Sequence, residues 1–93
     1  MKGSGHMQLK GNIISGEFDE QMNEFTLQQM KHFSTESTIK ENQLNALYHY
    51  LKKHENEPDG QVITLYDQMP VYLSQEDIKH FLSDLEKVQS LYH

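Results

Sequence analysis

The sequence contains no cysteine, no arginine and no long apolar run. The absence of cysteine excludes a disulfide framework and any metal site that depends on thiolate ligands. The longest nearly apolar stretch, QVITLY at 61–66, is far shorter than the roughly 20 residues that a membrane-spanning helix needs. We therefore expect a soluble, cytoplasmic protein with no membrane partner.

The missing arginine also bears on nucleic-acid binding. Arginine is the side chain best suited to bidentate contacts with phosphate and guanine. Fourteen acidic residues stand against eight lysines, which gives a formal net charge of −6. This balance favours another protein with a basic surface as the partner, attracted by electrostatic steering. A local lysine cluster still acts within a screening length, so nucleic acid stays open as the less favoured partner.

The first residues of the sequence differ in composition from the rest of the chain. Residues 1–7, MKGSGHM, have the small, flexible composition of an expression scar left at a cloning site. Residues 8–93 predict a single small domain, because a chain of this length builds only one marginal core. Its first part, 8–16, has some β character in Ile13 and Ile14 but is interrupted by glycines. It predicts an extended arm or an edge strand.

The stretch FDEQMNEFTLQQMKHF, at 18–33, predicts a first helix. Its apolar side chains recur at helical spacing on one face: Phe18, Met22, Phe25 and Phe33. Leu27 and Met30 fall off that stripe. Two interpretations stay open: the helix buries a broad face, or these two residues form a second apolar patch for a partner.

A second helix is predicted after a break at 34–38. Thr38 and Glu41 have the spacing of a capping box, in which each side chain bonds an otherwise unpaired backbone amide. The helix is expected to run to about Glu55. Its apolar stripe is Leu44, Leu47, Tyr48 and Leu51.

The rest of the chain predicts a β pair and a last helix. Two runs of β-type residues, 62–66 and 69–73, follow the turn at Pro58, and Pro70 restricts the second run to an edge or an extended segment. Ser74 is placed to cap a helix over 74–93. The stripe of that helix is Ile78, Phe81, Leu82, Leu85, Val88 and Tyr92. The predicted fold is mainly α (α+β), with three helices and a short β-hairpin or extended pair between helices 2 and 3.

The sequence shows no pattern that predicts catalysis. A nucleophilic site needs a serine or cysteine with a positioned base, and no serine sits in a G-x-S-x-G elbow. Glu76, His80 and Asp84 recur every four residues along the last helix, where a metal could be held loosely. No second segment bears ligands, so a solvated helix edge is the favoured interpretation. We expect no enzyme activity, no catalytic residues, no cofactor and no metal.

We therefore expect a small, acidic, non-enzymatic regulatory module that acts by protein–protein interaction, as an inhibitor or adaptor does. Five tyrosines give more amphipathic surface than so small a core needs, and tyrosine is enriched at interfaces. A β edge with an unpaired side would also suit a second copy, and so a homodimer. The predicted partner-binding residues are Leu27, Met30, Tyr50, Tyr66 and Tyr72.

The alternative is a winged-helix-like DNA-binding transcriptional regulator with a C-terminal dimerisation helix. Residues 26–44 resemble a helix-turn-helix motif, with 62–73 as the wing and 74–92 as the dimerisation helix. The candidate contacts to bases and phosphates are Lys40, Asn42, Gln43, Asn45, His49, Lys52 and Lys53. This alternative gains if the second helix projects its lysines outward beside the β pair. It fails if the last helix covers the polar face of the second.

Overall fold

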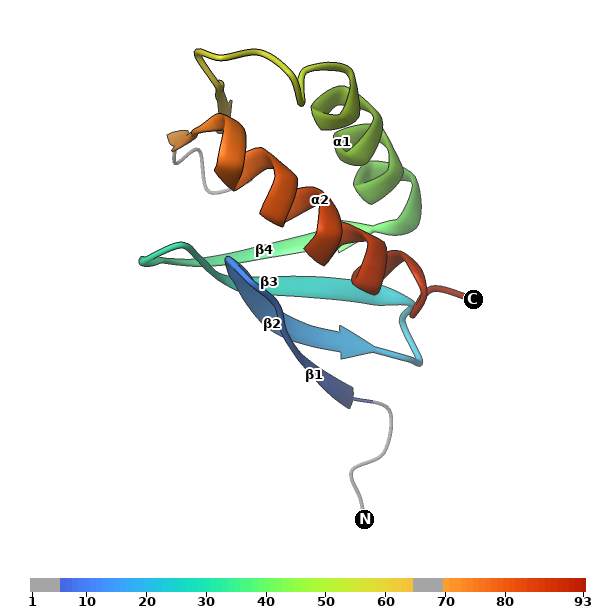
Figure 1. Cartoon of the computed structure of the whole chain (residues 1–93). Coiled ribbons are helices and arrows are strands. Elements are labelled where there is room, and N and C mark those ends of the chain that lie inside the picture. The colour runs from blue at the N-terminus through green and yellow to red at the C-terminus, as the bar shows by residue number, and fades with distance from the viewer. Residues whose placement is uncertain (1–5, 65–69) are drawn as a thin grey trace.

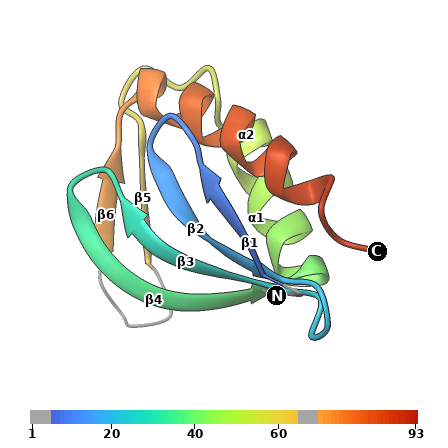
Figure 2. The same ribbon diagram turned by 90° about the horizontal axis from the view of Figure 1, so that it is seen from below.

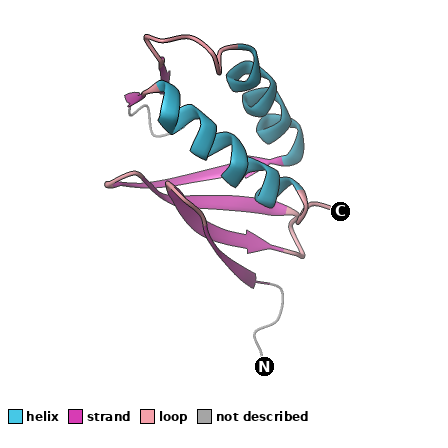
Figure 3. Cartoon of the chain, viewed as in Figure 1, coloured by secondary structure: helices cyan, strands magenta, loops and turns pink. Residues whose placement is uncertain are grey.

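The computed structural model describes residues 6–64 and 70–93 of the chain. Along the sequence its elements are β1 (His6–Lys10), β2 (Ile14–Asp19), β3 (Glu24–Met30), β4 (Phe33–Lys40), α1 (Glu41–Lys53), β5 (Gln61–Thr64), β6 (Pro70–Leu73) and α2 (Gln75–Gln89). The first four strands form an antiparallel sheet in sequence order, and β5 and β6 pair in a separate small sheet. Both helices lie on the same face of the four-stranded sheet (Figures 1 and 3).

The prediction of a mainly helical fold with three helices is therefore wrong. The described residues form two helices and six strands. The stretch predicted as the first helix, 18–33, contains the end of β2, all of β3 and the start of β4. Phe25 and Leu27 are both buried and lie two residues apart, which is the spacing of a strand face. Phe18 and Phe25, which a helix would place on one stripe, are direct partners across β2 and β3.

Two short turns, without glycine or proline, break this stretch. After β2, the Asp19 carboxylate accepts hydrogen bonds from the backbone amides of Gln21 and Met22, at 2.9 and 3.1 Å. Asn23 then takes a left-handed conformation with φ of 55°. Between β3 and β4, Lys31 does the same with φ of 56°. An Asp at the start of a turn and an Asn in the left-handed region are common turn devices, but neither interrupts a helical apolar pattern in the sequence.

The boundary between the predicted break at 34–38 and the second predicted helix also differs. Residues 34–38 belong to β4, so Thr38 is in a strand and does not cap a helix. The N-cap of α1 is Lys40, whose backbone amide donates to Gln43 Oε1 at 2.9 Å. The helix ends at Lys53, about two residues before the predicted end.

The C-terminal third agrees with the sequence pattern. β5 and β6 pair antiparallel, as expected for a β pair before the last helix, although 65–69 lie outside the described residues. Ser74 caps α2: its Oγ accepts from the Asp77 amide at 3.1 Å, and Asp77 Oδ2 accepts from the Ser74 amide at 3.1 Å. All six predicted stripe residues are buried, but α2 ends at Gln89, so Tyr92 lies beyond the helix that was predicted over 74–93.

The core lies between the helices and the inner face of the four-stranded sheet. Its largest fully buried side chains are Phe18, Phe25 and Phe81. Near the end of the chain, the Tyr92 ring meets the Phe18 ring edge-on with centroids 5.0 Å apart, and its hydroxyl donates to the Ile39 carbonyl at 2.6 Å. Burial raises the pKa of Tyr92 well above its usual value, so this hydroxyl stays protonated as a donor.

The outer face of the four-stranded sheet is polar. Cross-strand register places the following residues in rows on this face: His6, Asp19, Glu24 and Lys40; Gln8, Glu17, Thr26 and Thr38; Lys10, Ser15, Gln29 and Ser34. Figure 2 views the molecule from this side, with the helices behind the strands. An antiparallel sheet with one polar face is stable in water without a second layer. Neither described helix has the length and apolar character needed to cross a membrane.

Candidate functional site

The outer face of the small β5–β6 sheet is apolar, in contrast to the large sheet. Five large hydrophobic side chains are exposed among the described residues: Met7, Met22, Tyr50, Val62 and Tyr72. Val62 and Tyr72 are direct partners across β5 and β6, and they are 58% and 53% exposed. On the other side of this sheet, Ile63, Val71 and Leu73 are buried in the core. The small sheet therefore presents a valine–tyrosine pair to solvent.

Tyr50 of α1 joins this pair through the segment that leads into β5. The Tyr50 hydroxyl donates to Gln61 Oε1 at 2.7 Å, and the Tyr72 hydroxyl donates to the Asp59 carbonyl at 3.0 Å. Both phenol groups are thus fixed on the stretch 59–61. We call Tyr50, Val62 and Tyr72 the tyrosine patch. Tyr50 is 43% exposed, so each member of the patch keeps a large accessible surface.

Gly60 holds the backbone next to the tyrosine patch. Its φ is +73°, in the left-handed region that favours glycine. A Cβ at this position would lie 2.2 Å from the Leu73 carbonyl oxygen and 3.0 Å from the Tyr72 hydroxyl. The close approach fixes the start of β5 against the end of β6. The patch is therefore presented by a constrained backbone.

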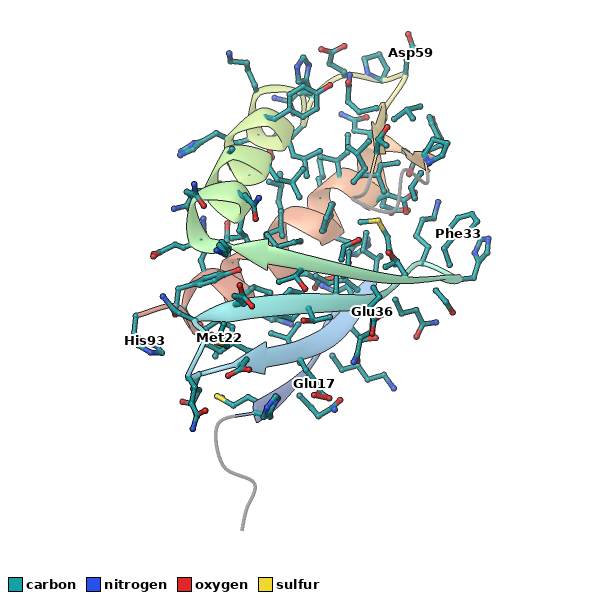
Figure 4. The ribbon with its side chains drawn as sticks, turned by 180° about the vertical axis from the view of Figure 1, so that it is seen from behind. Glu17, Met22, Phe33, Glu36, Asp59 and His93 are labelled. Atoms are coloured by element: carbon teal, nitrogen blue, oxygen red, sulfur yellow. The ribbon has the colours of Figure 1, made fainter. Side chains whose placement is uncertain are left out.

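Charged side chains border the patch on the connection between α1 and β5. Lys52 Nζ lies 3.2 Å from Glu55 Oε1, and the hydrogen bond with this carboxylate raises the pKa of Lys52. His54 Nδ1 lies 2.5 Å from Glu57 Oε1. Asp59 follows and projects from the end of the molecule (Figure 4). Glu55 and Glu57 thus have basic partners within the chain, so among these described carboxylates Asp59 is the one left to attract a basic partner.

Two of the predicted partner-binding residues are not on the surface. Leu27 is 1% exposed and Met30 is 0% exposed, because both point from β3 into the core. The expected second apolar patch on a helix is therefore wrong, and these side chains hold the sheet to the helices. Tyr66 lies outside the described residues. Val62 was missed, although the alternation in QVIT would have placed it opposite Ile63.

The residues predicted to contact nucleic acid are on or next to α1. Those that are exposed are Lys40, Asn42, Gln43, His49, Lys52 and Lys53. Asn45 is half-buried, and its Oδ1 accepts from Gln89 Nε2 of α2 at 3.1 Å. The outward face of α1 is thus not covered by α2, the arrangement that favours the DNA alternative.

Two other observations count against that alternative. The helix-turn-helix predicted over 26–44 does not form, because β3 and β4 occupy 26–40. Carboxylates also accompany two of the lysines: Lys40 Nζ lies 3.9 Å from Glu24 Oε2, and Lys52 pairs with Glu55. The exposed face of α1 therefore carries less free positive charge than the sequence suggests.

The predicted solvated edge of the last helix is wrong at Asp84, which is fully buried. Its carboxylate accepts hydrogen bonds from the backbone amides of Asn12, Ile13 and Ile14, at 2.7, 2.8 and 3.2 Å. Asp84 therefore fastens α2 to the β1–β2 connection. Glu76 and His80 remain exposed. Within 6–64 and 70–93, no group of three or more His, Asp or Glu side chains is placed to hold a metal ion.

Comparisons with protein-family models, with curated proteins and with solved structures gave no match. The surface chemistry of the chain therefore carries the functional proposal. Within that surface, the tyrosine patch contains three of the five exposed large hydrophobic side chains of the described residues.

Proposed function

We propose that this protein is a small, acidic, non-enzymatic regulatory module that binds another protein through Tyr50, Val62 and Tyr72. One observation carries the proposal. Val62 and Tyr72 are direct partners across β5 and β6 and are more than half exposed, and a third exposed large hydrophobic residue, Tyr50, is bonded to Gln61, the neighbour of Val62. An inhibitor or an adaptor would use such a surface, because its action requires binding only. The cytoplasm remains the proposed compartment.

The geometry of the patch suits binding. Tyrosine supplies a large contact area with few rotatable bonds, and central tyrosines are frequent among residues that dominate interface energies. Hydrogen bonds already fix the hydroxyls of Tyr50 and Tyr72. Less side-chain freedom is then lost on binding, which improves affinity. The patch is therefore preorganised for binding.

The partner should carry a basic rim around an apolar centre. The protein has a formal net charge of −6, and Asp59 lies beside the patch, where its carbonyl accepts from the Tyr72 hydroxyl. Complementary charge raises the rate of association and is screened by salt. Binding should therefore slow as ionic strength rises, whereas the apolar contact at Val62 and Tyr72 should control dissociation.

The test compares two altered proteins as baits with the unchanged protein. In the first, Val62→Thr and Tyr72→Thr remove the apolar patch but keep β-forming residues on the strands. In the second, the control, Met22→Thr removes an equally exposed apolar side chain from the β2–β3 turn. Each bait is incubated with lysate of the source cells, and captured proteins are quantified by mass spectrometry and then titrated in purified form.

We expect one protein to be captured by the unchanged bait and by Met22→Thr, with at least tenfold less recovered by the double variant. Its purified form should bind directly with the same ranking. Equal capture by all three baits would exclude the tyrosine patch as the binding surface. Sedimentation of the unchanged protein in the same buffer shows whether a second copy is the partner.

A second candidate function, DNA binding through α1, is favoured by one specific observation. Asn42, His49 and Lys53 are exposed on a helix face that α2 leaves uncovered. Titration of labelled duplex DNA at low and moderate salt tests this function. Binding that weakens steeply with salt, and is reduced by Lys53→Ala, would support it, because neutralised phosphates release counterions. No binding at low salt would remove it.

A further inference from the structure

A pocket of about 370 Å³ lies between two turns at one end of the four-stranded sheet. One wall is the β1–β2 connection, residues 10–15, and the other is formed by Gln29, Lys31 and His32 around the β3–β4 turn. Asp77 of α2 also lines it. Figure 2 shows both turns at the end of the sheet that lies under the start of α2. No residue of the tyrosine patch lines this pocket.

The two walls are held in place by bonds between distant parts of the chain. The Lys31 amide donates to the Ile13 carbonyl at 2.7 Å, which joins one turn to the other. The Lys31 side chain donates to Asp77 Oδ2 at 2.9 Å and to the Tyr72 carbonyl at 3.3 Å. On the opposite wall, Asp84 holds the amides of residues 12–14. The pocket is therefore formed before any ligand binds.

The pocket has a surplus of positive charge although the protein is acidic. Lys10, Lys31 and His32 line it, against the single carboxylate of Asp77. That carboxylate forms an ion pair with Lys31. Burial alone would raise the pKa of Asp77, but the hydrogen bonds from Lys31 and Ser74 outweigh it and keep the pKa below its usual value. Lys10 is then the cationic group left to meet a ligand, and the His32 ring offers an N–H donor beside it.

We propose that this pocket binds a small organic molecule through its phosphate group. A phosphate monoester carries a charge of about −1.5 to −2 at neutral pH and offers only acceptor oxygens. Lys10, His32 and the Ser15 hydroxyl supply donors from both walls. A volume of about 370 Å³ lies at the small end of the range for ligand pockets, roughly 300–1,000 Å³, which fits a sugar phosphate better than a larger cofactor.

The experiment titrates the ¹⁵N-labelled full chain at constant ionic strength and follows the backbone amides by NMR. The probes are ribose 5-phosphate, inorganic phosphate and acetate. We expect saturable shifts confined to residues 10–15 and 29–32, with ribose 5-phosphate binding more tightly than inorganic phosphate and acetate not binding. Lys10→Gln and His32→Gln should each weaken binding at least tenfold. The control is Lys79→Gln, an exposed lysine of α2 that does not line the pocket.

Several results would overturn the proposal. Shifts that grow linearly with phosphate, or that follow lysines over the whole surface, would show general ion attraction only. Equal binding of acetate would assign the pocket to carboxylates instead. The same loss of affinity in Lys79→Gln would remove Lys10 and His32 from the site. The amide spectrum of each variant reports whether it is folded. None of these results bears on binding at the tyrosine patch.

Discussion

The two sheets of this protein present opposite chemistry to solvent. The four-stranded sheet buries Phe18, Phe25 and Leu27 against the helices and shows water an outer face of polar rows. The β5–β6 sheet also buries its inner face, but its outer face carries Val62 and Tyr72. The large sheet shows that this sequence can make an outer face polar. The outer face of the small sheet therefore differs from that of the large sheet in exposing an apolar pair.

The largest expected effect concerns the attachment of the large sheet to α2. Asp84→Ala leaves three backbone amides of the β1–β2 connection without their acceptor in a buried place. We expect a loss of about 3 kcal/mol in the free energy of unfolding, since hydrogen bonds to charged groups contribute roughly 1.5–3 kcal/mol and unpaired buried donors add a penalty. Urea unfolding followed by circular dichroism measures it. The control is Ser83→Ala, an exposed neighbour; equal stability of both variants would contradict the role of Asp84.

On the small sheet, the largest expected effect is at Gly60. Gly60→Ala puts a Cβ 2.2 Å from the Leu73 carbonyl at a φ of +73°. We expect a loss of about 2 kcal/mol, because an unfavourable backbone conformation costs roughly 1–3 kcal/mol. The same unfolding experiment measures it, with exposed Asn56→Ala as the control. An unchanged midpoint would show that the junction of β5 and β6 is not constrained as described.

A smaller effect concerns the ion pair between Lys31, in the β3–β4 turn of the large sheet, and Asp77 of α2. The folded-state pKa of Asp77 is lowered from 3.8, so its contribution is present above pH 3.8 and is lost as pH falls through the folded-state pKa. Asp77→Asn should cost about 1 kcal/mol at neutral pH, the upper end for a partly exposed pair. The difference from the unchanged protein should shrink in acid. Exposed Glu76→Gln is the control, and a pH-independent difference would contradict this assignment.

The smallest expected effect tests the difference between the outer faces of the two sheets directly. Val62→Thr with Tyr72→Thr makes the outer face of the small sheet as polar as that of the large sheet. Both side chains are more than half exposed, so stability should change by only about 0.5 kcal/mol. Thermal and urea unfolding measure it. A loss of several kcal/mol would mean that the tyrosine patch serves the fold, and the proposed binding function would lose its main support.

The C-terminal part of the fold could be predicted because its signals are local. Ser74 caps α2, and the helix stripe recurs without interruption. The four-stranded sheet could not be predicted in the same way. Phe18, Met22 and Phe25 fit a helical period by coincidence: Met22 is an exposed turn residue, while Leu27, which did not fit, marked the true strand period. The turns that end β2 and β3 contain no glycine or proline, so the sequence did not indicate where these strands end.

The candidate sites show the same limit. Tyr50 and Tyr72 could be chosen from residue type, because tyrosine suits a surface that is partly apolar and partly wet. Val62 required knowledge of which strand face is buried. The burial of Asp84 depends on contacts between segments about 70 residues apart, and the pocket depends on the contacts of Lys31 with Ile13 and Asp77. No local pattern encodes either.

Asp84 also joins parts of the chain that are far apart in the sequence. The hairpins of β1 to β4 form from neighbouring residues, whereas the bonds of Asp84 to Asn12 and Ile14 join positions 72 and 70 residues apart. Contacts of such long sequence separation carry a large loop-closure entropy, which slows folding. On a ribosome, the amides of the first connection must wait for α2 to be synthesised. The β1–β2 connection therefore gains its side-chain acceptor only when α2 is in place.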